Sequence, residues 1–323
     1  MSSDPKRTFT RRDLLRIGAT TVAAGAALAT LGLRGRKISH PPKLFRIKDH
    51  RVARPAGANE MVIVRGPDAA ENVRRALEAL GGMGAFVRPG DKVVIKPNVG
   101  WNRLVEQAAN TNPDVVAVLV RAVVAAGASK VWVADVPVNS PDRCFERSGI
   151  RRAVGEAGGT VVMPETSAFR EVEVGGQLLR VGEVLYPFVD ADKVINVPVV
   201  KQHSLSAATM AMKNWYGVLG GQRVRLHQDI HRSIVELSAM MKPTLTVLDG
   251  TRVLLANGPS GGSLDDVKRM DTIAAGMDEV ALDAFGATLL GLTAQAVASI
   301  AAGEAAGLGR ADYRSLKLVE LGT

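Results

Sequence analysis

The sequence has few of the residues on which several large classes of protein depend. Its 323 residues include one cysteine, Cys144, which excludes an internal disulfide. An iron–sulfur cluster normally takes four thiolates, so a single cysteine speaks against one. Aromatic residues make up only 4% of the chain, which disfavours the stacking platforms that bind bases or sugars. We interpret Cys144, within a predicted helix, as a buried structural thiol.

Several enzyme motifs are absent as well. The glycines of residues 257–262 do not have the dinucleotide-binding spacing, and no Gly-Lys-Ser/Thr of a Walker A loop occurs. The chain also lacks the Gly-x-Ser-x-Gly nucleophile elbow of the α/β-hydrolases. Gln228 follows His227 where the zinc peptidase motif requires a glutamate. The sequence therefore does not predict a member of any of these classes.

The positive charge is concentrated at the N-terminus. The formal net charge is +9, and residues 1–37 hold eight Lys/Arg against two Asp/Glu, which leaves only +3 for the remainder. The chain after residue 37 is only weakly basic, and such a charge gives no reason to expect nucleic acid as a partner. A small anionic ligand remains compatible with it, because local fields matter more than the total charge.

An export signal is predicted over residues 1–37. Arg11 and Arg12 precede a weakly apolar stretch, Ile17 to Leu33, as in twin-arginine signals. We expect the twin-arginine translocase to carry the folded protein to the periplasm or another extracytoplasmic space. Whether the signal is cleaved stays open, and an uncleaved signal would be the chain's contact with a membrane. A polar linker is predicted over residues 38–60.

Residues 61–323 alternate between strand and helix patterns, which predicts a single α/β domain. Its expected fold is a mostly parallel open sheet with flanking helices and one β-hairpin insertion over residues 171–185. Strands are expected at 61–65, 92–96, 130–134, 160–163, 193–197, 244–248, 271–275 and 315–321. Helices are expected at 69–80, 112–126, 141–157, 205–217, 226–241, 279–292 and 294–306.

Polar residues follow four of the predicted strands. In open α/β sheets, ligands bind outside the carboxyl ends of the strands, so these residues are expected to converge on one crevice. The alternative is that they are ordinary turn and cap residues. The residues concerned are Lys96, Asn98, Asp135, Lys201, His203 and Asp249.

Three of the five histidines lie within 29 residues of one another: His203, His227 and His231. His227 and His231 are four positions apart in a predicted helix and would share a face. With His203 they could chelate a divalent metal. A polar helix face with exposed imidazoles is the alternative.

A Lys213-Asn214 pair precedes a glycine break at Gly217 and suits binding of a phosphate or carboxylate. Backbone N–H groups near glycine add donors to such a site. The glycine-rich loop around Gly258 is a second candidate for anion binding, and a plain connecting loop is its alternative.

Over about residues 60–292 these motifs resemble the domain of unknown function 362 family. The matching segments include Lys96-Pro97-Asn98, Lys201-Gln202-His203, Met212-Lys213-Asn214, Leu248-Asp249-Gly250 and Ala275 to Asp278. The resemblance implies no assigned activity, and it implies ferredoxin-type modules in many members, which this chain lacks. The positions that match the family's recurring polar residues are Lys96, Asn98, Lys201, His203, Lys213, Asn214, His227, Asp249 and Asp278.

Two functional hypotheses follow. The first is a metal- or cofactor-dependent enzyme acting on an anionic small molecule, and the order of His, Lys, Gly and His across 203–227 is similar in pattern to nickel-pincer lactate racemases. Its catalytic residues would be His203, Lys201, Lys213 and Asp249. Its anion-binding residues would be Lys96, Asn98, Asp135, Asn214 and Gly258. The second is a non-catalytic periplasmic protein that binds a metal ion or an anion, and an assembly protein without chemistry is a further alternative.

Overall fold

The computed structural model describes residues 44–54 and 56–322. The predicted signal over residues 1–37, with Arg11 and Arg12, lies outside the described residues. Among the helices that are described, none has the length and apolar character needed to cross a bilayer.

The compact unit begins before the first predicted strand, at Leu44, and extends to Thr323. The later part of the predicted linker packs onto this unit. The backbone N–H of Phe45 donates to the carbonyl of Glu171 at 2.8 Å, and the side chain of His50 is buried. Residues 44–54 and 56–60 are therefore part of the fold.

The main sheet is mostly parallel, as predicted. Its strands lie in the order β12-β1-β11-β10-β7-β2-β3-β4, and β8 pairs with β10 and β9. Among the described strands of this sheet, only β11 and β9 run antiparallel to their neighbours. The strands are β1 (Met61–Arg65), β2 (Lys92–Pro97), β3 (Lys130–Ala134), β4 (Thr160–Val162), β7 (Lys193–Val197), β8 (Val199–His203), β9 (Ala207–Thr209), β10 (Leu245–Leu254), β11 (Val267–Gly276) and β12 (Leu318–Leu321).

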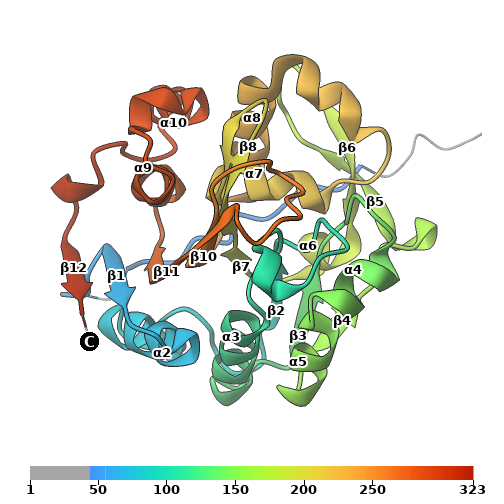
Figure 1. The fold of residues 1–323 in the computed structure, drawn as a ribbon. Helices are drawn as coiled ribbons and strands as arrows, with labels where there is room; N and C mark the ends of the chain where they lie inside the picture. Colours follow the sequence, from blue (N-terminus) through green and yellow to red (C-terminus); the bar gives the residue numbers. More distant parts are fainter. Residues whose placement is uncertain (1–43, 55, 323) are drawn as a thin grey trace, which may run out of the picture. The chain divides into compact units, whose positions relative to one another are not determined.

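Helices cover both faces of this sheet (Figure 1). On one face lie α2 (Ala69–Ala79), α3 (Pro113–Ala125), α4 (Pro141–Arg147) and α5 (Ile150–Glu156). On the other lie α6 (Tyr186–Asp190), α7 (Ala211–Asn214), α8 (Ile230–Met241), α9 (Glu279–Leu289) and α10 (Ala298–Ala305). The fold is therefore a three-layer α/β arrangement.

The strands build both cores because successive side chains point to opposite faces of a sheet. In β2, Val93 and Ile95 belong to the core beneath α2 and α3, whereas Val94 belongs to the core on the other side. A strand covered on both faces is apolar throughout, which explains the unbroken Val-Val-Ile run of this strand.

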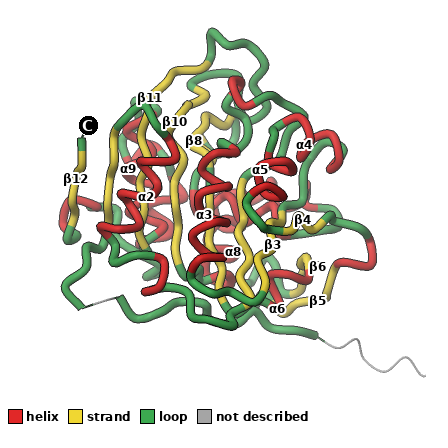
Figure 2. The backbone as a smooth tube through the Cα atoms, turned by 90° about the horizontal axis from the view of Figure 1, so that it is seen from below, coloured by secondary structure: helices red, strands yellow, loops and turns green. Residues whose placement is uncertain are grey.

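The predicted hairpin is confirmed. Strands β5 (Phe169–Glu173) and β6 (Val181–Leu185) form a separate antiparallel pair. Figure 2 shows this pair at the end of the molecule away from β12.

Two predicted helices are wrong in detail. The segment 205–217 contains β9, the four-residue helix α7 and the 3-10 turn η4 (Trp215–Val218). The segment 226–241 divides into the 3-10 helix η5 (Arg223–Asp229) and α8, because the backbone of Asp229 is not helical (φ −136°, ψ 72°) and its side chain caps α8. Strand β8, which pairs with β10, also lies in a segment for which no regular element was predicted.

Candidate functional site

A cavity of about 560 Å³ opens at the carboxyl ends of β2 and β3. Lys96 stands near the end of β2, and Asp135 directly follows β3. Strand β8 and the segment from α7 to η5 complete the wall. The polar lining residues are Lys96, Asn98, Asp135, Lys201, His203, Ser204, Thr209, Lys213, Asn214, Tyr216, Gln222, Arg223 and His227.

Lys96 and Asp135 form a fully buried ion pair on one wall. The Lys96 Nζ donates to Asp135 Oδ1 at 2.8 Å and to Asn214 Oδ1 at 3.1 Å. Asp135 Oδ2 accepts the backbone N–H of Val99 at 2.6 Å. A Cβ at Gly217 would lie 1.9 Å from Asp135 Oδ1, so only glycine fits there. These hydrogen bonds fix the positions of Lys96 and Asp135 and leave few of their polar atoms free to bind a ligand.

Amide side chains connect the ion pair to the next lysine. Asn98 Nδ2 donates to Asn214 Oδ1 at 3.0 Å, and Asn98 Oδ1 accepts from Lys201 Nζ at 3.0 Å. Asn214 Nδ2 donates in turn to Asn196 Oδ1 at 2.8 Å. The two predicted asparagines therefore orient the lysines through a continuous hydrogen-bond network.

Lys201 is a buried cation without a carboxylate partner among the described residues. Its Nζ donates to Asn98 Oδ1 and, at 2.6 Å, to the carbonyl of Ala109. Burial, followed by the charge of Lys213, lowers the pKa of Lys201 to about 7. Lys201 and His203 are two positions apart in β8, so both point to the same side of the strand.

Lys213 is also buried, at 8% exposure, and it lies in the short helix α7. Its Nζ is 4.3 Å from the centre of the Tyr216 ring, and within the described chain it donates no hydrogen bond. Burial, followed by the charge of Arg223, lowers the pKa of Lys213 to about 8. Losing water without gaining acceptors penalises the charged form.

Arg223 is a cavity residue that the sequence did not reveal. Its Nη1 donates to the carbonyls of Val136 at 2.7 Å and Tyr216 at 3.2 Å, and its Nη2 donates to Pro137 at 2.9 Å. Burial lowers its pKa, although the nearby Asp135 partly offsets this. It lies at the start of the short 3-10 helix η5, ahead of the helix predicted over residues 226–241, so no local pattern marks it.

His203 and His227 meet at the cavity. Their rings are stacked with centroids 6.4 Å apart, and the Tyr216 ring is 5.5 Å from His227. His203 Nδ1 accepts the backbone N–H of Leu205 at 3.1 Å, which places the proton of the neutral ring on Nε2. Burial, followed by the charges of Lys213 and Lys201, lowers the pKa of His203 to about 3. This imidazole is neutral at pH 7.

The predicted three-histidine site is not assembled. His227 lies in η5 and His231 in α8, so the two do not share a helix face, and His231 is not among the cavity residues. Across residues 44–54 and 56–322, no three His, Cys, Asp or Glu side chains converge to hold a metal. The cations around His203 would also repel a metal ion. This donor set does not fit a divalent metal.

Two further predicted site residues lie elsewhere. Asp249 is within β10, not after it, and its carboxylate accepts the backbone N–H groups of Asn112 at 2.7 Å and Thr251 at 3.0 Å. The amide of Gly258 donates to Gln202 Oε1 at 2.8 Å. Neither residue lines the cavity. Asp249 instead ties β10 to the start of α3.

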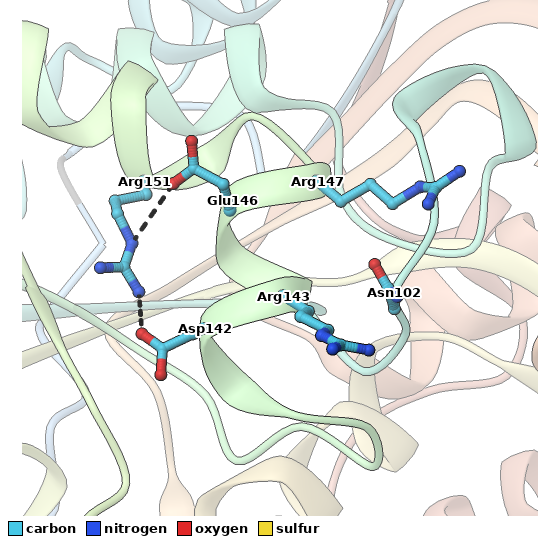
Figure 3. Close-up of a pocket in the computed structure, with 6 residues that line it drawn as sticks. All are labelled: Asn102, Asp142, Arg143, Glu146, Arg147 and Arg151. Atoms are coloured by element: carbon cyan, nitrogen blue, oxygen red, sulfur yellow. Dashed lines mark hydrogen bonds and ion pairs between the residues drawn. The ribbon is translucent and has the colours of Figure 1, made fainter.

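A second hollow, of about 590 Å³, lies beside α4. Its arginines take different positions (Figure 3). Arg151 contacts Asp142 at 2.7 Å and Glu146 at 3.8 Å, whereas Arg143 and Arg147 extend toward the side of Asn102. These charged side chains are exposed, so solvent screens them, and we do not assign a site there.

A family model described as "Domain of unknown function (DUF362)" matches residues 93–288. The chain belongs to this family. It is 31% identical over 252 residues to the thylakoid-associated protein sll1697 of Synechocystis, an alignment that covers 73% of this chain and 74% of the relative. The resemblance inferred from the sequence is thereby confirmed.

Two solved structures are distantly similar to this chain. The lactate racemase apoprotein of Thermoanaerobacterium thermosaccharolyticum has a TM-score of 0.37 at 14% identity, covering 74% of this chain and 58% of that one. A Thermotoga maritima protein has a TM-score of 0.35 at 13% identity, covering 61% and 54%. The chain spans a little over half the length of each, and neither supports an argument about activity.

Proposed function

We propose that this protein is an enzyme that binds a small anionic molecule in the cavity and transfers a proton on it. One observation carries the proposal: Lys201 and Lys213 are buried and Arg223 is half-buried around the cavity, and none of the three forms an ion pair with a carboxylate in the described part of the chain. Uncompensated buried charge is costly. An anionic ligand would supply the missing counter-charge.

The anion would be a carboxylate or a phosphate. Arg223 has five N–H groups, of which three donate to backbone carbonyls, and the remaining two can donate to a pair of ligand oxygens. Lys213 adds a point charge that has no competing acceptor in the described chain. Lys96 contributes less, because Asp135 already neutralises it.

Proton transfer is supported by the ionisation of the surrounding groups. Lys201 has a pKa lowered to about 7, so about half of it is neutral and can accept a proton at physiological pH. His203, with a pKa of about 3, stays neutral and can donate a hydrogen bond through its Nε2–H. General bases work best with a pKa near the operating pH. Displaced pKa values of several groups around one cavity are typical of catalytic sites.

Binding and catalysis can be tested separately. Isothermal titration of the full chain with phosphate, lactate and pyruvate should detect binding of at least one of them, and Arg223→Gln should weaken it about tenfold or more. NMR in D₂O would then report deuterium incorporation into the carbon-bound protons of the bound anion above the uncatalysed rate. Binding without exchange would favour the non-catalytic binding protein, and no binding at all would refute the proposal.

We also propose export through the twin-arginine route, on the evidence of Arg11 and Arg12. The test is cell fractionation of the full chain against a variant with both arginines replaced by lysine. Retention of the variant in the cytoplasm, with the parent outside it, is expected. Equal distribution of the two would contradict the proposal.

A further inference from the structure

We propose that Lys213 forms a covalent imine with the carbonyl carbon of a small 2-oxo acid, such as pyruvate, bound in the cavity. This inference rests on the proposed function, because it names the class of anion and gives one cationic residue a chemical role. Its geometric basis is the difference between Lys213 and the other two lysines of the cavity.

Among these lysines, only Lys213 has an unengaged amine within the described chain. The Nζ of Lys96 donates to Asp135, Asn214 and the carbonyl of Pro97. The Nζ of Lys201 has two acceptors at 3.0 and 2.6 Å. The Nζ of Lys213 contacts the Tyr216 ring and lines the cavity without an acceptor. The hydrogen bonds donated by Lys96 and Lys201 stabilise their ammonium forms and hold the two Nζ atoms in place, whereas the Nζ of Lys213 has no such bond and can turn toward a ligand.

The surroundings of Lys213 favour its neutral form. A lysine is activated as a nucleophile when it is desolvated or lies next to another cation. Both apply here, since burial is the largest cause of its lowered pKa and Arg223 the next. With a pKa of about 8, roughly a tenth of the amine is neutral at pH 7, against well under a thousandth for an ordinary lysine.

The backbone that carries this amine is held from behind. Asp283, fully buried in α9, accepts the N–H groups of Ala211 at 2.6 Å and Met212 at 3.2 Å. Asn214, which directly follows Lys213, is held by hydrogen bonds from its side chain to Asn196 and to the backbone carbonyl of Lys96. Lys213 therefore projects from a rigid turn, so that reaching the substrate requires only side-chain rotation.

The remaining groups match a 2-oxo acid. The free N–H groups of Arg223 and the ammonium of Lys201 suit its carboxylate. The Nε2–H of His203 can donate to the adjacent carbonyl oxygen, because its Nδ1 is occupied by Leu205. A simple carboxylate such as acetate would leave this last donor unused.

The reaction balances without another reagent. The neutral Nζ attacks the carbonyl carbon, a C–N bond forms, and the electrons of the C=O π bond move to oxygen. One proton passes from nitrogen to that oxygen and gives a carbinolamine. The hydroxyl takes a proton from solvent and leaves as water, while the nitrogen lone pair forms the C=N bond of a protonated imine.

Reductive trapping tests this step on the full chain. The protein is incubated with pyruvate and sodium cyanoborohydride, and intact mass spectrometry is followed by peptide mapping. We expect one adduct per chain on Lys213, with a mass gain of one pyruvic acid less one oxygen atom. Lactate, which has no carbonyl, should give none. Lys213→Arg keeps the charge and should lose the adduct, whereas Lys130→Arg, at an exposed lysine over the Trp132 ring, should retain it.

The outcomes separate this inference from the proposed function. If pyruvate raises the melting temperature but no adduct forms, or adducts are spread over surface lysines, the imine is wrong and anion binding stands. If phosphate binds and pyruvate does not, the imine is also wrong. If no anion binds, both proposals fail. Mapping the adduct in the parent chain does not depend on any variant folding.

Discussion

Replacing Lys213 by methionine is expected to stabilise the ligand-free protein while weakening its affinity for anions. The pKa of Lys213 falls from 10.5 to about 8, and each pKa unit corresponds to about 1.4 kcal/mol. Keeping this buried group charged at pH 7 therefore costs about 3 kcal/mol. Methionine removes the charge and keeps a chain of similar length, while the contact with the Tyr216 ring loses roughly 1 kcal/mol. The net gain in unfolding free energy is about 2 kcal/mol.

The assay compares thermal and urea unfolding of the parent and Lys213→Met without added anions. A rise in melting temperature of roughly 5 °C is expected for a domain of this size. Titration with the anion that binds the parent should show affinity reduced about tenfold to a hundredfold, since a charged hydrogen bond is worth about 1.5–3 kcal/mol. Lys130→Met is the matched control, because it also removes a lysine over an aromatic ring but an exposed one.

Lys213→Met is expected to raise the free energy of unfolding and to lower the affinity for anions. A variant that is less stable than the parent at pH 7 would show that Lys213 is not a strained cation, and the charge argument for the cavity would fail. If Lys130→Met raised the free energy of unfolding by a similar amount, the cause would be the introduced methionine and not the loss of a buried charge. Residues kept for function often lower stability in this way.

Other predictions concern the groups around the cavity and behind it. Asp135→Asn should destabilise the protein by about 3–5 kcal/mol in urea unfolding, because it leaves the buried Lys96 charge without its partner. Gly217→Ala should lower both melting temperature and anion affinity, since its Cβ would displace Asp135. Asp249→Asn should cost about 1–3 kcal/mol in unfolding free energy yet leave anion affinity unchanged in calorimetry, because Asp249 lies outside the cavity. Anion affinity should fall as the pH rises through about 8, because Lys213 then loses its charge. The stability of the ligand-free protein, measured by urea unfolding, should instead rise between pH 8 and 10. In that range the unfolded lysine, with its pKa of 10.5, still holds the proton that the folded lysine has released.

Much of the fold was predictable because the relevant signals are local. Runs such as Val93 to Ile95 bury both faces of a central strand, and Asn112-Pro113 begins a helix with a cap and a proline in its first turn. The alternation of such strands with helices predicts a parallel sheet. The segment 205–217 was mispredicted because β9 and α7 are three and four residues long, too short to show a period.

The histidine prediction failed for a similar reason. A spacing of four residues places His227 and His231 on one face only if the helix is continuous. Asp229 ends one element and caps the next, so the shared face does not exist. Asp249 was misplaced because its strand continues to Leu254 in pairing with β11, and this pairing was not predicted from the local sequence.

Local patterns were enough to predict the α/β class, the family and most of the polar residues that meet at the strand ends, since each depends on short patterns or on residue identity. The pairing of the buried charges could be read only from the folded chain. Lys96, Lys201 and Lys213 are the same amino acid, yet one is paired with Asp135, one is held by neutral acceptors and one has no acceptor in the described chain. Their ionisation depends on burial and on neighbours distant in sequence, and these exist only after the chain has folded.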